Sequence, residues 1–371
     1  MDLTPFRELT RTTGPFASVF LDASHEVEDA AHVLDLRWRE LRESLVTQGT
    51  DADTLRALDD AIRDRRPAVG RAGRGLVAAH GRVLVDRYLS TPPPQPTAHW
   101  GRLPHLTPLV TGQHRPVPHL VAVVDRLGAD LHVVDHDGRV VVERSVQGEE
   151  HPAHKVGEGG FAHRKIQQRV ENLAEQNAST VAEEIDRLVQ QNAPRLLVLA
   201  GEVQARSAVA DRLGRAARDI LVETGIGGRA AGADEPALWR EAQRLATERA
   251  AAEERDTVKR FRAELGRHSG RAVTGLRRVA TALRQGQVDT VLLAEDLPTD
   301  RTLWVGAEPN QLATEEAELR GEGASPVTPD RADAALLYAL AATGGRVYVV
   351  HVTDEGRPEL AEGVGALLRY A

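Results

Sequence analysis

The apolar positions in the first third of the chain follow two different periods. A continuous apolar run predicts a buried strand, and two stretches with apolar residues three and four apart predict helices. Two short runs on either side of His80-Gly81 predict a hairpin. In chain order these elements span residues 16–21, 27–45, 53–63 and 75–85. The prolines between Pro92 and Pro118 then disfavour a regular helix or a central strand, because proline lacks an amide N–H, and they mark a boundary.

The second stretch carries strand and helix patterns in turn. Three apolar runs, the last two joined at Asp137-Gly138, predict a meander, which is followed by a long helix, a buried strand, a second helix and a further strand. Their residues are 119–124, 129–134, 139–143, 163–192, 194–200, 203–213 and 219–223. Alternating strands and helices are typical of a mostly parallel, helix-covered sheet. The glycine-rich residues 225–232 miss the Rossmann spacing, and we interpret them as a flexible connection.

A very long helical pattern over residues 235–265 leads into the third stretch. There, helices are predicted over 272–283 and 330–342, and strands over 290–294, 302–305 and 346–352. The chain is therefore predicted to be an α/β protein with three domains, each of an ordinary size. Their boundaries are 1–117, 118–255 and 256–371.

Composition and charge narrow the possible functions. The 371 residues include no cysteine, which excludes disulfides, thiolate zinc ligands and cysteine nucleophiles. The net charge of −8 argues against uniform coating of a polyanion, but arginines are concentrated between residues 63 and 87. A solvated loop with a basic bias and a surface that docks on defined phosphates explain this segment equally well. The candidate contacts are Arg63, Arg65, Arg66, Arg71 and Arg74.

Recognisable motifs for secretion, cofactors and metals are missing from the sequence. The first ten residues have neither the basic nor the apolar part of a secretory signal, and no apolar run reaches the ~18 residues of a membrane span, so a cytoplasmic location is expected. Without a phosphate-binding loop, a nucleophile elbow or H-E-x-x-H, we expect no cofactor and no catalytic metal. Asp125, Asp130 and Asp135 could form a nuclease-like carboxylate set, but surface strand ends are the favoured interpretation.

The most informative segment joins a glycine loop to the start of the predicted long helix. It places cations in the first helical turns, where they oppose the helix dipole. A docked polyanion would relieve that conflict, and the neighbouring amide and imidazole groups could add contacts to phosphates or bases. A solvated helix end accounts for the same pattern. The candidate residues are His154, Lys155, Gly159, Gly160, Phe161, His163, Arg164, Lys165, Gln167, Gln168 and Arg169.

Several motifs resemble those of the archaeal and eukaryotic class I release factors and Pelota. Residues 256–265 and 272–293 look like the opening of that family's third domain, and Gly363-Val-Gly-Ala-Leu-Leu-Arg-Tyr370 resembles its end. The stretch from Lys165 to Glu183 resembles the helix after the family's Gly-Gly-Gln loop. The resemblance covers residues 118–371 and implies a ribonuclease-H-like central domain and a C-terminal α/β/α domain similar to kink-turn-binding ribosomal proteins. It also implies that the N-terminal α/β unit, which matches no motif of the family, lies near the decoding centre.

One departure from the family pattern bears on activity. Where releasing members carry Gly-Gly-Gln, this chain has Gly159-Gly160-Phe161, and phenylalanine has no donor or acceptor with which to orient the attacking water. The pattern resembles the bacterial branch of the family, with its Balon-like ribosome hibernation factors that similarly lack the tripeptide. The resemblance therefore implies a ribosome-binding factor that occupies the A site without catalytic residues of its own.

The implied partners are large- and small-subunit rRNA, with tRNA and elongation factor Tu as further candidates, and neither a membrane nor DNA. The 154–169 segment would face large-subunit rRNA, and the arginines from Arg63 to Arg74 would face small-subunit rRNA or tRNA. Two alternatives remain. One is a peptidyl-tRNA hydrolase or tRNA-cleaving rescue enzyme with a glutamine supplied from position 167 or 168, and the other is a stress protein that uses the fold for protein contacts alone.

Overall fold

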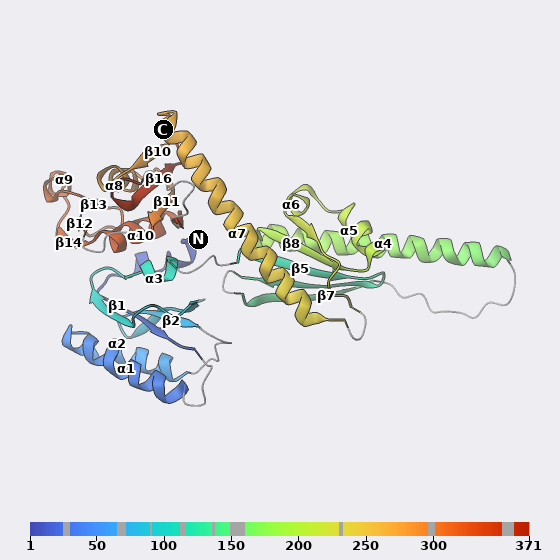
Figure 1. Ribbon diagram of the computed structural model, residues 1–371, viewed down its shortest axis with the longest axis horizontal. Coiled ribbons are helices and arrows are strands. Elements are labelled where there is room, and N and C mark those ends of the chain that lie inside the picture. Colours follow the sequence, from blue (N-terminus) through green and yellow to red (C-terminus); the bar gives the residue numbers. More distant parts are fainter. Residues whose placement is uncertain are drawn as a thin grey trace. The chain divides into compact units, whose positions relative to one another are not determined.

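The computed structural model describes most of the chain (Figure 1). The described residues are 1–24, 30–64, 72–89, 91–111, 116–135, 138–148, 160–229, 233–295, 301–350 and 360–370, without the side chains of 30–32 and 160–171. This part is a mixed α/β protein with four sheets, and the chain divides into two compact units, 1–113 together with 254–371, and 114–253. Among the helices described, none is both long and apolar enough to cross a membrane.

The N-terminal segment forms an antiparallel sheet with the strand order β3-β2-β1-β4. Its elements are η1 Thr4–Phe6, η2 Leu9–Arg11, β1 Phe16–Asp22, β2 Gly73–Ala79, β3 Arg82–Leu89 and β4 Thr97–Gly101. The predicted β2–β3 hairpin is confirmed, and both turn residues, His80 and Gly81, have positive φ as its two-residue turn requires. The strand β4 was not predicted because prolines flank it, but it lies at the edge of the sheet, where such a strand is tolerated.

Strand β1 is buried on both faces because each face joins a different core. Ala17, Val19 and Leu21 pack against the helices α1 (Ala30–Thr47) and α2 (Ala52–Arg63). The second of these helices starts at an N-cap aspartate, Asp51, which accepts a hydrogen bond from the Thr54 amide at 2.8 Å. Residues of opposite parity on β1 therefore face away from these helices.

The opposite face of β1 belongs to a core shared by the beginning and the end of the chain. Phe16, Phe20 and Leu106 belong to the same cluster as helix α10 (Ala332–Thr343), whose residues from Ala332 to Ala341 are all buried. A helix that is apolar on all sides must be covered on all sides, and the short helix α3 (Thr107–Val110) supplies part of this cover. The first 113 residues and the last 118 thus form one compact unit.

The C-terminal segment contributes two sheets, β10-β16-β11-β15 and β13-β12-β14. Its elements are β10 Ala272–Thr274, α8 Leu276–Arg284, β11 Val288–Ala294, β12 Thr302–Val305, β13 Leu312–Ala313, α9 Glu316–Gly321, β14 Thr328–Arg331, β15 Arg346–Val350, η3 Ala361–Gly363 and β16 Val364–Leu368. The predicted helix 272–283 is wrong at its beginning, because β10 pairs with β16 and α8 starts only after Gly275, whose φ is 91°. The strands β13, β14 and β16 and the helix α9 were not predicted from the apolar pattern.

The central unit has one sheet with the order β7-β6-β5-β8-β9. Its strands are β5 His119–Val124, β6 Gly128–Val134, β7 Val140–Gln147, β8 Leu196–Gly201 and β9 Leu221–Glu223. The prediction of a mostly parallel sheet is wrong, since β5–β8 and β8–β9 are parallel but β5–β6 and β6–β7 are antiparallel. Tight turns join the three meander strands, and such turns connect antiparallel neighbours only.

Two long helices pack on opposite faces of this sheet. Leu120, Ala122 and Val124 belong to the core under α4 (Gly160–Asn192). The neighbouring residues Val121 and Val123 belong to the core under the first half of α7 (Glu235–Gly266). The shorter helices α5 (Val203–Ala210) and α6 (Arg215–Arg218) contribute residues to the same core as α4.

Candidate functional site

The candidate segment 154–169 meets the described structure at the beginning of α4. His154, Lys155 and Gly159 lie outside the described residues, whereas Gly160 is the first residue of α4 and Phe161 the second. The helix therefore begins earlier than the predicted position 163. The remaining candidates, His163, Arg164, Lys165, Gln167, Gln168 and Arg169, lie in its first three turns, and their side chains are outside the described part.

Helix α4 is anchored to the central sheet through its C-terminal part. Among its described side chains, burial starts at Asn177 and continues through Val181, Ile185 and Leu188. The Nδ2 of Asn177 donates a hydrogen bond to the backbone oxygen of Arg126, just beyond the end of β5, at 3.0 Å. Asn177 therefore marks the point at which α4 passes the carboxyl edge of the sheet.

Residues 160–176 of α4 precede this anchor, and the helix runs on past the sheet (Figure 1). At a rise of 1.5 Å per residue, a helical stretch of this length is roughly 25 Å long. Gly160 and Phe161 are therefore the first residues of a long helical arm.

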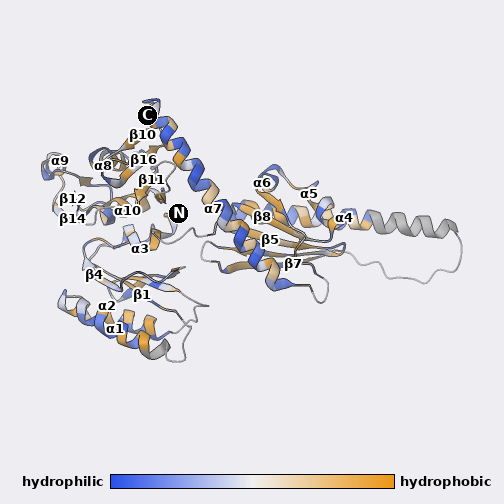
Figure 2. Cartoon of the chain, in the orientation of Figure 1, coloured by the Kyte–Doolittle hydropathy of each residue, from blue (hydrophilic) through white to orange (hydrophobic). Residues whose placement is uncertain are grey.

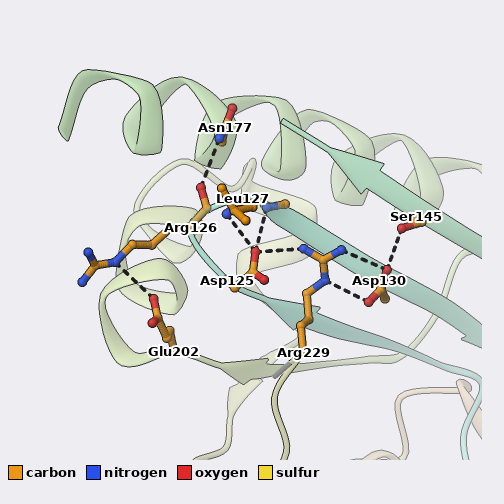
Figure 3. A network of polar contacts seen from close by, with 9 residues as sticks. Asp125, Arg126, Leu127, Asp130, Ser145, Asn177, Glu202 and Arg229 are labelled. Atoms are coloured by element: carbon orange, nitrogen blue, oxygen red, sulfur yellow. Dashed lines mark hydrogen bonds and ion pairs between the residues drawn. The ribbon is translucent and has the colours of Figure 1, made fainter. Parts of the chain in front are cut away.

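The carboxyl edge of the sheet, at the base of the arm, is organised by Arg229 (Figure 3). Its Nη1 donates to Asp125 Oδ1 and its Nε to Asp130 Oδ2, each at 2.8 Å, and its side chain is 15% exposed. Asp130 also accepts a hydrogen bond from Ser145 Oγ at 2.7 Å. The described part of the glycine-rich segment, interpreted above as flexible, is thus tied to the turn between β5 and β6.

The charges of this cluster hold one another in the ionised form. Burial raises the pKa of Asp130, but hydrogen bonds from Arg229 and Ser145 outweigh it, so that the pKa lies below its ordinary value. Burial lowers the pKa of Arg229, and hydrogen bonds to Asp130 and Asp125 more than compensate and raise it. Both groups are charged at neutral pH, and neither is suited to exchange a proton there.

The three aspartates considered for a nuclease site are used differently. The guanidinium of Arg229 bridges Asp125 and Asp130, whereas Asp135 accepts a hydrogen bond from the Arg139 amide at 2.9 Å in the turn between β6 and β7. Throughout the described stretches, no group of three or more His, Cys, Asp or Glu side chains is placed to hold a metal ion.

A cleft of about 430 Å³ lies next to this cluster, on the face of the β6–β7 hairpin that is turned toward α7. Its lining includes Asp130, His132, Ser145, Arg229 and Trp239. The rings of His132 and Trp239 meet edge to face at 5.3 Å, and the charged Asp130 and Arg229 are bonded to each other. The volume is at the lower end of ligand pockets, and two of the charged groups in the lining, Asp130 and Arg229, already neutralise each other.

The N-terminal arginines have unlike surroundings. Arg65, Arg66 and Arg71 lie outside the described residues, and Arg63, at the end of α2, is exposed and 3.7 Å from Asp60. Arg74 is 3% exposed and donates to both carboxylate oxygens of Asp86 at 2.8 Å. Because its guanidinium is held in an interior ion pair with Asp86, Arg74 is no longer a candidate for contact with RNA.

Sequence reasoning missed the Arg229 cluster, although a signal for it exists. Asp125 directly follows β5 and Arg229 follows β9 by a few residues. The strands β5, β8 and β9 are parallel, so their carboxyl ends lie at one edge of the sheet. An aspartate and an arginine after such strands are expected to meet once the strand order is known.

Comparison with known proteins places the chain in a family. Residues 118–267 match the family model described as bacterial archaeo-eukaryotic release factor family 2, and residues 251–371 match eRF1 domain 3. Two curated relatives come from Mycobacterium tuberculosis strains H37Rv and CDC 1551 and are named Uncharacterized protein Rv2629 and Uncharacterized protein MT2704. Each is 34% identical over 367 residues, covering 98% of this chain and 96% of its own.

Solved structures align with much lower identity. Archaeoglobus fulgidus Pelota is 13% identical with a TM-score of 0.32, over 100% of this chain and 92% of its own. The termination-like factor Dom34 of S. cerevisiae is 10% identical with a TM-score of 0.39, over 81% and 80% of the two chains. The archaeal translation termination factor aRF1 is 15% identical with a TM-score of 0.27, over 98% and 96%. On the two family models, the chain belongs to the bacterial archaeo-eukaryotic release factors, family 2, and ends in an eRF1 domain 3.

Proposed function

We propose that this protein binds the ribosome as a release-factor-like translation factor that does not release the nascent peptide. The observation that carries the proposal is the sequence Gly159-Gly160-Phe161, whose last two residues begin α4, in a chain of this family. Hydrolysis of the peptidyl ester needs a group that orients water, and the phenyl ring of Phe161 has neither donor nor acceptor. The tripeptide would then contact the site without performing the reaction.

The beginning of α4 is the proposed contact with large-subunit rRNA. Arg164, Lys165 and Arg169 lie in the first three turns of the helix, where a bound phosphate would offset their conflict with the helix dipole. The helical arm of roughly 25 Å supports a role in reaching the peptidyl-transferase centre. We extend the proposal to occupation of the A site during hibernation or stress, with the N-terminal sheet near the decoding centre.

Two features of the fold support the finer assignments of the domains. In the central unit, an antiparallel meander continued by two parallel strands fits a ribonuclease-H-like domain. In the C-terminal segment, the sheet β10-β16-β11-β15 packs with α8 and α10 on one side and with Phe261 of α7 in a separate cluster, as expected for an α/β/α domain similar to kink-turn-binding ribosomal proteins. Archaeal Pelota has been described in a ribosome-bound form, which is the precedent for the partner. Elongation factor Tu and tRNA are the further partners of the proposal.

The alternative is a peptidyl-tRNA hydrolase that uses Gln167 or Gln168. These residues follow Phe161 by six and seven positions on the same helix, which places them roughly 9–10 Å further along its axis. A misplacement of ~1 Å can already lower the rate of an oriented reaction by ~100-fold. A glutamine so far along the arm is a poor substitute for one at position 161.

The test combines sedimentation with a release assay. We expect the protein to co-sediment with ribosomes through sucrose and to release no peptide from programmed ribosomes, with either a stop or a sense codon in the A site. Phe161→Gln, which rebuilds the family's tripeptide, is the matched variant and should bind equally well. Absence from the ribosomal fractions would refute the binding proposal. Robust release by the wild type that Gln167→Ala or Gln168→Ala abolishes would establish the hydrolase instead.

A further inference from the structure

The second half of α7 and the residue just after it present a dense row of cations to solvent. The exposed basic residues of this half are Arg255, Lys259, Arg260 and Arg262, and the exposed Arg267 follows directly after the helix ends at Gly266. We call these five residues the α7 stripe. Asp256, 3.7 Å from Lys259, is the one exposed acidic residue among positions 255–267. Arg267 lies 3.5 Å from Glu264. Within the described residues, Arg255, Arg260 and Arg262 have no carboxylate within 4 Å, although the charge of Arg260 contributes to lowering the pKa of Asp289. Five exposed cations with three arginines outside any ion pair are unexpected on a chain whose net charge is −8.

The geometry of the helix distributes these side chains over its exposed half. Phe261 is fully buried and packs with Val258 and Leu265, which fixes the side of α7 turned toward the sheet. At 3.6 residues per turn, positions 255, 259 and 262 fall on one strip that flanks the buried side, and positions 260 and 267 fall about 120° further around the axis. The five residues span roughly 18 Å along the axis. Figure 2 shows this hydrophilic stretch of α7 in blue.

The stability of the helix does not explain the stripe. Arg255 and Lys259 are four residues apart and Lys259 and Arg262 three apart, spacings at which like charges repel one another on a helix surface. The helix dipole favours cations at the C-terminal end, which accounts for Arg267 just beyond that end but not for the residues one to three turns earlier. A bound anion would remove the repulsion.

We propose that the α7 stripe docks on the phosphate backbone of double-helical RNA. The guanidinium of arginine can bind a phosphate through two parallel hydrogen bonds, and four of the five stripe residues are arginines. An acidic protein surface is the less suitable partner, because stable protein interfaces need apolar or aromatic anchors, and the exposed large apolar side chains of the described residues all lie outside α7. Single-stranded RNA is disfavoured for a related reason, since the stripe has no aromatic ring on which a base could stack.

The experiment measures binding of the full chain to a fluorescent RNA duplex of about 20 base pairs over a range of salt concentrations. In the triple variant Arg255→Gln/Lys259→Gln/Arg262→Gln, we expect affinity at ~0.1 M salt to fall by at least about tenfold. The slope of log affinity against log salt should decrease by about three, because roughly one counterion is released per phosphate contact. The matched control, Arg240→Gln/Arg244→Gln/Arg249→Gln, changes the net charge equally on the first half of the same helix and should bind within about twofold of the wild type.

Several outcomes would overturn the inference. These are an unchanged slope in the stripe variant, an equal loss in the control, equal binding of a non-pairing single strand, and displacement of the duplex by polyglutamate at the same charge concentration. The identification of the RNA as ribosomal rests on the proposed function. The binding of duplex RNA by the stripe does not depend on that function. If the wild type fails to sediment with ribosomes, the proposed function is refuted, whatever the result with the RNA duplex. If the affinity for the duplex does not depend on the stripe, this inference is refuted, whatever the result with ribosomes.

Discussion

The two halves of α7 use their arginines in different ways. In the first half, Arg244 lies 2.7 Å from Glu241 and 2.5 Å from Glu248, and Arg249 lies 3.3 Å from Glu253. Arg240 is the exception there, with no such pair among the described residues. In the second half, Arg255, Arg260 and Arg262 have no carboxylate within 4 Å in the described part of the chain. Ion pairs between residues three or four positions apart stabilise the first half of α7, whereas repulsion between like charges at the same spacings destabilises the second half.

This difference teaches that charge count alone does not identify a binding surface. The two halves are similar in arginine content, and what separates them is whether the chain supplies the counter-charge. By the same distinction, Arg74 is not a candidate contact, because Asp86 pairs with it. Arg229 and Arg331 are likewise paired with aspartates, and these ion pairs belong to the folded structure. Paired arginines should therefore affect stability when changed, and unpaired ones should affect binding.

The largest effect on stability is expected from the buried carboxylate of Asp333. This residue is 3% exposed and accepts hydrogen bonds from Thr107 Oγ1 at 2.6 Å and from Arg331 Nη2 at 2.8 Å. Asp333→Ala leaves the guanidinium without its partner, and we expect a loss of about 3–5 kcal/mol in the free energy of unfolding, measured in urea. Asp256→Ala, which removes the exposed partner of Lys259, is the control and should change stability little. A loss below ~1 kcal/mol for Asp333→Ala would contradict the distinction.

A smaller loss is expected for Arg229→Ala. The variant leaves Asp125 and Asp130 without their shared donor, and hydrogen bonds to charged groups are worth about 2 kcal/mol. Arg229→Lys keeps the charge but not the two-pronged geometry, so its loss should be intermediate. Hydrogen exchange should accelerate at the Leu127 and Gly128 amides, which donate to Asp125. If Arg229→Ala matched the wild type in both measurements, the cluster would have no structural role.

The pH dependence of stability gives a third test of paired charge. Hydrogen bonds lower the pKa of Asp130 despite the opposing effect of burial, and the same holds for Asp333. A folded-state pKa below the unfolded value of about 3.9 stabilises the protein above that pH, and the contribution is lost as the pH falls through the folded-state pKa. We expect this contribution to be constant between pH 7 and 5 and to decline below about pH 4. The stability difference between the wild type and Arg229→Ala should shrink over the same acidic range, and a difference that grows there would refute the assignment.

The smallest effects belong to the exposed cations of α7. The stripe variant should keep its melting temperature within about 2 °C or raise it slightly, because like-charge repulsion is removed. Arg244→Gln loses two surface pairs and should lower the melting temperature slightly at most. A thermal scan of both variants checks the comparison. A large drop in the stripe variant would mean that these cations have partners in the folded chain.

Local periodicity predicted the elements whose surroundings are uniform along their length. The strands β1 and β5 are continuous apolar runs, and α4 has an unbroken helical stripe, so each could be identified without knowing its neighbours. The strand β10 could not, because its conformation depends on pairing with β16, more than ninety residues further along the chain. The mixed direction of the central sheet likewise depended on which connections were tight turns.

The candidate site was predictable to a similar degree. The departure from Gly-Gly-Gln and the cations that follow it can be read directly from the sequence. The burial of Arg74 was not visible, because it depends on the pairing of β2 with β3, which brings Asp86 beside it. The α7 stripe was present in the sequence as well, but the packing of Phe261 was needed to show which side of the helix faces solvent.

The core shared by the two ends of the chain has a consequence for biosynthesis. Phe16, Phe20 and Leu106 leave the ribosome long before α10, which covers them. At ~5–20 residues per second, the roughly 230 residues that separate α3 from the end of α10 take about 10–50 s to translate. During that interval the nascent chain exposes an aromatic face, which makes it a natural client for chaperones that bind apolar segments. An early stop codon after residue 113 should accordingly yield a polypeptide that aggregates, although its own sheet is complete.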